Sequence, residues 1–286
     1  MIGKEPARGI RSLQPSSVNG WPVNRWRKPM AKSNFWPCLK VSLSHEGGWA
    51  DHKKDPGGAT MKGVTLATFR RFKPGASKAD LRRISDEDLQ HIYRTGYWTP
   101  ISGDKLAYGV DLAVLDYGIN SGPARAARYL QAVVGVKQDG VIGPQTLKAA
   151  VMTGGKSVIQ KLCAKRLAFV QGLKTWKHFG RGWSRRIADV EAKAVAMWLT
   201  KGKRATEAAR AEMEADAKAA EKKAKAQDTG AGGAAAGGGG AVVTAEPNWM
   251  LLAAVAVLVI AGVVLFVKAR QNKDRSQAYR AAASAL

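Results

Sequence analysis

A glutamate followed by two glycines opens the stretch of sequence richest in residues that could do chemistry. Glu46 follows an apolar helical stripe and precedes Trp49, and Asp55 begins the turn-like segment Asp-Pro-Gly-Gly. Apolar surroundings favour the protonated form of a carboxyl, whereas a carboxyl in a polar turn stays ionised. Two carboxyls in unlike surroundings suit glycosidic bond hydrolysis, in which one donates a proton and the other supports the cation-like transition state or activates water. The simpler interpretation is that Glu46 pairs with a nearby lysine and Asp55 caps a turn.

The same stretch resembles the glycoside hydrolase family 108 lysozymes, which are N-acetylmuramidases of phages and bacteria. Their Glu-Gly-Gly-Tyr and Asp-x-Gly-Gly-x-Thr-x-x-Gly motifs are matched by residues 46–49, with Trp49 in place of Tyr, and by residues 55–63. The resemblance implies that Glu46 is the essential acid. The spacing is also similar to the phage lysozyme pattern of Glu, eight residues, Asp, five residues and Thr. Asp55 fits this pattern, but Thr60 comes one residue early, so Thr65 is an alternative for positioning water.

Further residues are candidates for binding the saccharide. Trp49 offers an aromatic face, and Gly57 and Gly58 let a polymer approach the backbone closely. Trp98 follows two tyrosines and is a candidate for the rim of a cleft, although aromatic residues at helical spacing are also typical of a core. Asn120 lies in an Asn-Ser-Gly-Pro turn that resembles one in the family, where its amide would line the sugar cleft; the same turn is typical of one helix ending and another beginning.

A second resemblance covers residues 130–147, which are similar to peptidoglycan-binding repeats. The shared core is Leu130-Gln131, then Asp139-Gly140 and two residues later Gly143-Pro144, with Thr146 after it. Asp139-Gly140 is also a turn signal, and Pro144 suits the first position of a helix. The segment therefore predicts either contact with the cell wall or a packing role.

Helices are expected to position these residues. Phe35, Leu39 and Leu43 recur at helical spacing, and Ser85 with the acidic residues after it resembles a helix N-terminus. Further helices are expected over 112–117, 124–134, 158–173 and 187–199, whereas alternation typical of strands is scarce. The predicted fold class is mainly α: a lysozyme-like helical domain, then a charged helical and Gly-rich linker and one C-terminal transmembrane helix.

Composition divides the chain into six regions. They are a disordered basic leader (1–32), a catalytic lysozyme-like region (33–115), a peptidoglycan-binding-like helical region (116–200), a linker that is Ala/Glu/Lys-rich and then Gly-rich (201–248), a transmembrane helix (249–267) and a basic tail (268–286).

The predicted transmembrane helix contains nineteen residues without a charge. As a helix it spans about 28 Å, close to a bilayer core of about 30 Å. Trp249 at one end and Lys268 at the other suit interfacial anchors. The five basic residues after the span predict a cytoplasmic tail and a single pass through the bacterial inner membrane, with the catalytic domain facing the periplasm and cell wall. The alternative is retention of the domain on the inner side until the membrane is breached.

The charge of the chain predicts an anionic partner. Its 286 residues include 46 Lys and Arg against 22 Asp and Glu, a formal charge of +24. The excess is spread along the chain and no nucleic-acid-binding motif accompanies it, which favours peptidoglycan and not nucleic acid. Two cysteines and four histidines without a metal-site spacing predict no disulfide scaffold, metal or other cofactor. The expected function is cleavage of the β-1,4 bond between N-acetylmuramic acid and N-acetylglucosamine; the alternative is a non-catalytic, membrane-tethered peptidoglycan-binding anchor.

Overall fold

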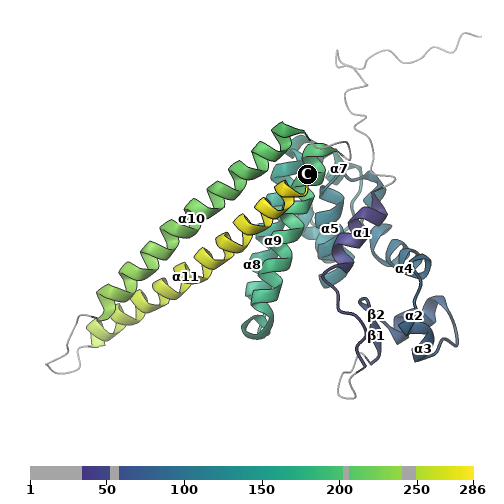
Figure 1. Ribbon diagram of the computed structural model, residues 1–286, viewed down its shortest axis with the longest axis horizontal. Helices are drawn as coiled ribbons and strands as arrows, with labels where there is room; N and C mark the ends of the chain where they lie inside the picture. Colours follow the sequence, from purple (N-terminus) through teal and green to yellow (C-terminus); the bar gives the residue numbers. More distant parts are fainter. Residues whose placement is uncertain (1–33, 52–57, 202–205, 240–248) are drawn as a thin grey trace, which may run out of the picture.

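The computed structural model describes residues 34–51, 58–201, 206–239 and 249–286 (Figure 1). These residues form a mainly helical body with one small β-hairpin and a pair of long C-terminal helices. The elements are α1 (Phe35–Leu43), β1 (Thr60–Met61), β2 (Val64–Thr65), α2 (Leu66–Phe72), α3 (Lys78–Arg82), α4 (Asp86–Tyr93), a π-helical turn (Arg94–Trp98), a 3-10 turn (Gly103–Lys105), α5 (Val110–Ser121), α6 (Pro123–Val134), α7 (Pro144–Thr153), α8 (Gly155–Gln171), α9 (Trp176–Thr200), α10 (Glu207–Gly239) and α11 (Trp249–Ser284).

Local sequence signals account for several helix boundaries. The stripe that begins at Phe35 forms α1 and buries Phe35 and Leu39. At α4, the Ser85 side chain accepts a hydrogen bond from the backbone N–H of Asp88, as an N-cap should. Pro123 occupies the first turn of α6 after a break at Gly122. The mainly α prediction is confirmed, and the short hairpin is the addition.

Helix α5 is the centre of the body. All its residues from Val110 to Gly118 are buried, and α1, α6, α8 and α9 pack around it. The predicted boundary between residues 115 and 116 falls inside this helix, and one continuous core includes residues on both sides. The two regions distinguished by their motifs therefore share one folded body.

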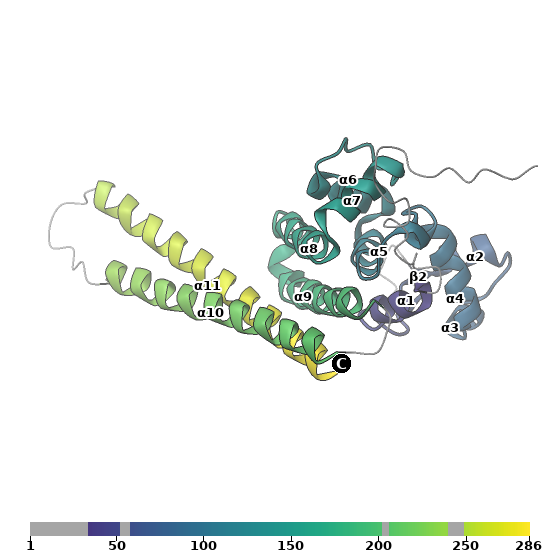
Figure 2. The ribbon, with the colours of Figure 1, turned by 90° about the horizontal axis from the view of Figure 1, so that it is seen from above.

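Helices α10 and α11 run antiparallel, side by side, away from this body (Figures 1 and 2). Residues 230–239, expected to be a flexible Gly-rich linker, continue α10. Glycine disfavours an isolated helix, but packing against a neighbour overrides that preference. Small residues also allow a close approach: a β-carbon at Gly230 would lie 3.3 Å from Cδ1 of Leu265. The expected Gly-rich linker is therefore helical over residues 230–239.

The region expected to be a separate basic tail is the second half of α11. The helix continues to Ser284 and packs along α9 (Figure 2). Tyr279 is fully buried there, and its hydroxyl donates to the buried Glu191 carboxylate, 2.9 Å away. The second half of α11 and the helical body are therefore packed together in this structure.

Candidate active site

Glu46 lies just beyond the C-terminus of α1. Its backbone N–H donates to the Leu43 carbonyl, which continues the last turn and fixes where the side chain emerges. The side chain is 19% exposed, and Nη1 of Arg186, on α9, donates to its Oε1 at 2.7 Å. The expectation of apolar surroundings is wrong in this respect, because the carboxylate is held by an arginine.

Arg186 connects Glu46 to a buried charge on α5. Its Nη2 donates to Oδ1 of Asp116 at 2.6 Å, and Nη1 of Arg166, on α8, donates to Oδ2 at the same distance. Asp116 has no exposed surface; burial alone would raise its pKa, but the two guanidinium groups hold the pKa well below its usual range. Arg166 also donates to the Asn120 side chain. This charge network ties α1, α5, α8 and α9 together around Glu46.

The β-hairpin closes over Glu46 from another direction. Its turn, Lys62 and Gly63, has positive φ angles of 47° and 76°, the geometry that matches the twist of a tight hairpin. The Tyr93 hydroxyl donates to the Lys62 carbonyl at 2.8 Å. A β-carbon at Gly63 would lie 2.6 Å from that hydroxyl and 3.2 Å from Oε2 of Glu46. Only glycine therefore lets the turn approach the carboxyl this closely.

The phenol of Tyr93 lies close to the carboxylate of Glu46. Burial raises the pKa of its phenol, and the negative charge of Glu46 raises it further. The phenol therefore stays protonated and serves as a hydrogen-bond donor to the hairpin turn. This contact holds the hairpin turn from α4, beside Glu46.

A cavity of about 300 Å³ opens beside Glu46. It is large enough for a saccharide unit and combines an acid, an amide, two guanidinium groups and an aromatic side chain, the groups that bind sugar hydroxyls and ring faces. Its lining residues are Glu46, Asn120, Ser121, Arg166, Val170, Leu173, Trp183, Arg186 and Ile187.

An aromatic cluster adjoins the cavity on α9. The rings of Phe179 and Trp183 lie 5.7 Å apart and those of Trp176 and Trp183 lie 6.3 Å apart. Phe179 is 56% exposed, so the cluster presents an apolar face to solvent beside the cavity. Such a face suits stacking against sugar rings.

The structure brings some of the predicted site residues to the cavity and places others elsewhere. Asn120 is brought to the same cavity as Glu46. Trp49 is half-buried, with the Arg82 guanidinium 5.6 Å from its ring centre, and Gly58 has a positive φ of 65°. Asp55 and Gly57 lie outside the described residues.

The two candidate threonines face each other across the hairpin. Thr60 pairs with Thr65 in the strand register, and its hydroxyl donates to the Gly58 carbonyl at 3.2 Å. The Thr65 hydroxyl accepts from the backbone N–H of Thr68 and so caps α2. Both hydroxyls are thus engaged in hydrogen bonds within or beside the hairpin, and the choice between Thr60 and Thr65 stays a prediction.

Trp98 is not at the rim of a cleft. It has no exposed surface and packs on Phe35, with ring centres 5.2 Å apart. A β-carbon at Gly103 would lie 2.3 Å from its indole, so the backbone of Gly103 covers the ring. Trp98 is a core residue, as aromatics at helical spacing often are, and its expected role in binding sugar is wrong.

The second motif builds a loop. The buried Gln131 side chain donates to Asp139 at 2.7 Å and to the Val141 carbonyl at 3.0 Å, and accepts from the Gly140 N–H at 2.9 Å. It also approaches the Thr146 hydroxyl at 3.3 Å. These bonds occupy the polar groups of the motif, which supports its packing role over wall contact.

Sequence reasoning missed Arg186, Arg166, Asp116 and Tyr93. Arg186 lies 140 residues from Glu46, and nothing in one sequence pairs them. One signal was present: Asp116 stands inside the apolar helical run 112–117, and a charge on a buried face requires partners. Among the residues that the structure describes, no group of three or more His, Cys, Asp or Glu side chains is placed to hold a metal ion.

The helical body and its acid-bearing cavity define a protein of the glycoside hydrolase class. Residues 39–122 match the model of the family Glycosyl hydrolase 108. The solved structure of Brucella abortus SagA is 46% identical, with a TM-score of 0.53; the match covers 59% of this chain and 97% of SagA. No curated protein matches the chain. The chain belongs to the glycosyl hydrolase 108 family and is a lysozyme-like glycoside hydrolase.

Proposed function

We propose that this protein cleaves the β-1,4 bond between N-acetylmuramic acid and N-acetylglucosamine in peptidoglycan, with Glu46 as general acid. The observation that carries the proposal is the position of Glu46: it is the acid at the edge of the saccharide-sized cavity, in the segment that matches the family. Arg186 holds Oε1, so Oε2 is the oxygen left to carry the proton.

In the proposed step, Oε2 of Glu46 gives its proton to the glycosidic oxygen as the bond to the sugar carbon breaks. The second carboxyl is Asp55, which would support the cation-like transition state or activate the water that completes hydrolysis. Retention of configuration requires a carboxyl separation of about 5 Å, and inversion about 6.5–9.5 Å.

The decisive experiment is mass spectrometry of sacculi digested by the wild type and by Glu46→Gln. We expect the wild type to release fragments with reducing ends and the variant to lose about 10²- to 10⁴-fold in rate, as removal of a general acid does. Glu87→Gln is the matched control, because Glu87 is exposed on α4. The variant should still bind sacculi.

Near wild-type hydrolysis by a folded Glu46→Gln protein would exclude the proposed mechanism. Cleavage of peptide bonds would exclude the proposed substrate bond. A wild type that binds sacculi but releases no sugar ends would instead be the non-catalytic anchor.

We further propose that the protein works at the bacterial inner membrane, with its catalytic domain on the periplasmic side, where peptidoglycan lies. One described helix, α11, is long and apolar enough to cross a membrane. Protease added to intact spheroplasts should degrade residues 33–200. Protection of that region until the membrane is permeabilised would place the domain inside.

A further inference from the structure

The apolar side chains of α11 are largely exposed to solvent. Within Ala253–Ser284, the most apolar stretch of 18 residues has a mean hydropathy of 2.2, and only 6% of that stretch is buried. Val257 and Ile260 are 64% and 62% exposed. A core helix of a soluble protein would be mostly covered, so this surface lacks a partner of its own polarity. Nineteen uncharged residues in a helix measure about 28 Å, the thickness of a bilayer core.

Both ends of the α10–α11 pair are attached to the catalytic body. In addition to the Tyr279 contact, Arg275 of α11 forms an ion pair with the buried Glu191 of α9 at 2.7 Å. Asp274 of α11 lies 3.7 Å from Arg185 of α9. The chain leaves the body along α10 and returns along α11, as Figures 1 and 2 show. A bilayer therefore cannot separate the C-terminus from the catalytic domain while these contacts hold.

The last charged residue of α10 and the first charged residue of α11 lie side by side in the helix pair. After Asp228, the rest of α10 contains only Thr, Gly and Ala, and before Lys268 the rest of α11 is uncharged. The close approach of Gly230 to Leu265 sets these two limits beside each other. The last eleven residues of α10 and the first nineteen of α11 are thus uncharged, whereas the rest of both helices carries charged side chains. Residues 240–248, which connect the two uncharged ends, include one charged residue, Glu246.

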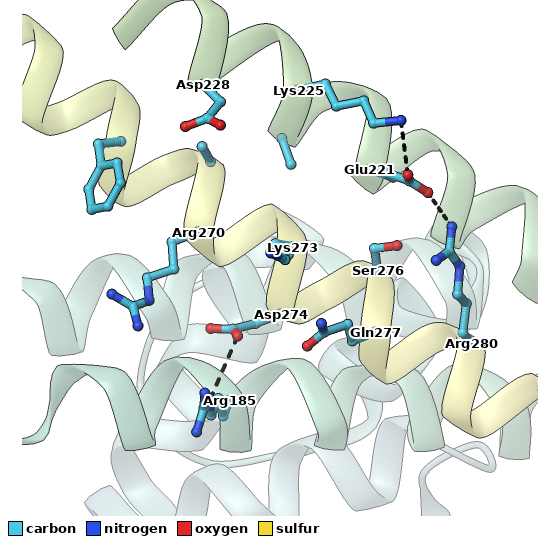
Figure 3. A pocket seen from close by; sticks show the side chains of 13 residues that line it. Arg185, Glu221, Lys225, Asp228, Arg270, Lys273, Asp274, Ser276, Gln277 and Arg280 are labelled. Carbon is cyan, nitrogen blue, oxygen red and sulfur yellow. Dashed lines mark hydrogen bonds and ion pairs between the residues drawn. The ribbon is translucent and has the colours of Figure 1, made fainter. Parts of the chain in front are cut away.

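A basic cavity of about 770 Å³ lies at this level, between α9, α10 and α11 (Figure 3). Five basic and three acidic side chains line it, with Phe266 and Ala269 on the side of the apolar segment. The basic residues are Arg185, Lys225, Arg270, Lys273 and Arg280, and the acidic ones are Glu221, Asp228 and Asp274.

Two of the cationic groups in this cavity are available. Glu221 pairs with Lys225 and Arg280, and Asp274 pairs with Arg185. Within the part of the chain that the structure describes, no ion pair engages Arg270 or Lys273, and Asp228 is also unpaired. Free cationic groups beside the end of an apolar segment are where the phosphate of a membrane lipid would lie.

We propose that the α10–α11 hairpin inserts the uncharged ends of its two helices into a bilayer, that the basic cavity binds the headgroup phosphate of an anionic phospholipid, and that the catalytic domain and the C-terminus stay on the same side. The apolar edge at Phe266 would meet the acyl chains, and Arg270 and Lys273 would donate to the phosphate oxygens. This arrangement replaces the single pass expected from sequence.

Topology is tested with the full chain added to preformed vesicles of phosphatidylglycerol and phosphatidylcholine. Single cysteines are introduced by Ala67→Cys in the catalytic domain, Ala285→Cys near the C-terminus and Val257→Cys in the apolar segment, and are labelled with a membrane-impermeant maleimide. The native Cys38 and Cys163 are buried, and the wild type measures their background.

We expect the first two positions to label fully and Val257→Cys to label only without vesicles. Protection of Ala285→Cys, with Ala67→Cys still labelled, would show a single pass and overturn the proposal. Undiminished labelling of Val257→Cys in the presence of vesicles would also overturn it, because the hairpin would then not insert.

The headgroup site is tested with Arg270→Ala combined with Lys273→Ala. The matched control removes the same charge from exposed positions of α10 outside the cavity, by Lys222→Ala with Lys223→Ala. For vesicles containing phosphatidylglycerol we expect the cavity variant to bind about 10- to 30-fold more weakly and the control to lose about threefold at most. Equal losses would show diffuse surface attraction and overturn the headgroup site. Circular dichroism checks that both variants fold.

Discussion

Arg186 is the residue on which the geometry of the acid depends. It bonds to Glu46 and to the fully buried Asp116 at once, so it sets the direction of the carboxyl and balances a charge that has no access to water. Arg166 supplies the second positive charge beside Asp116. Each of the two oxygens of Asp116 therefore accepts a hydrogen bond from a guanidinium group, and this pairing makes the buried charge tolerable.

Replacing Arg186 with methionine should therefore damage both stability and activity. Asp116 would keep one cationic partner in place of two, and we expect a loss of about 3–5 kcal/mol in the free energy of unfolding. Chemical denaturation measures it, with Arg181→Met, at an exposed position of the same helix, as control. Equal stability of the two variants would show that the network contributes little.

The buried carboxyl of Asp111 should make the free energy of unfolding depend on pH. Burial raises its pKa to about 7, against the opposing hydrogen bonds from Asn34 and from the Leu112 N–H. An unfolded aspartate ionises near pH 4, so between about pH 4 and 7 the folded chain keeps a proton that the unfolded chain has lost. Stability should fall as pH rises through this window and level off above it. Thermal unfolding of Asp111→Asn should lack this component; an unchanged pH profile would contradict the assignment.

At the scale of elements, the hairpin turn places backbone against the acid. Gly63→Ala introduces both a strained positive φ and a clash with Tyr93 and Glu46. Gly75→Ala is the control, because Gly75 has a similar φ of 79° with open space around it. Both should lose about 1–2 kcal/mol of stability, but only Gly63→Ala should slow hydrolysis, by about 10- to 100-fold. Similar rates for the two variants would show that the turn does not position Glu46.

Local signals predicted the helices well and the hairpin not at all. The stripe of α1, the cap of α4 and the proline start of α6 act within one or two turns, so they are readable in one chain. The two-residue strands β1 and β2 are too short for an alternation pattern, and their turn was hidden inside the glycine-rich motif. Residues 230–239 were misjudged because their helix depends on α11, a partner that propensity does not include.

The site was predicted in part for the same reason. Glu46 and Asn120 were singled out from motifs, and folding brings them to one cavity. Arg186 reaches that cavity from α9, far along the chain, and only the packing of α9 on α5 reveals it. Trp98 was misplaced because an aromatic residue gives the same sequence signal in a core as on a rim.

At the scale of the whole molecule, the formal charge of +24 should govern the approach to an anionic wall. Raising salt from about 0.05 M to about 0.5 M shortens the screening length to a few ångströms, so digestion of intact sacculi should slow severalfold. Hydrolysis of a short, soluble glycan fragment of peptidoglycan, which carries few charges, is the control and should change little. Equal salt sensitivity of both substrates would show that long-range attraction is not responsible.

The anchoring of α11 along α9 has a consequence for range of action. A flexible linker of about fifty residues would let an enzyme reach a large volume of cell wall. Here the same part of the chain is helical, and α11 is bound to the body by ion pairs, so the reach is short. Glycan strands would then be cut only where they come within one protein diameter of the lipid. The number of strands within that distance would depend on wall thickness and turgor.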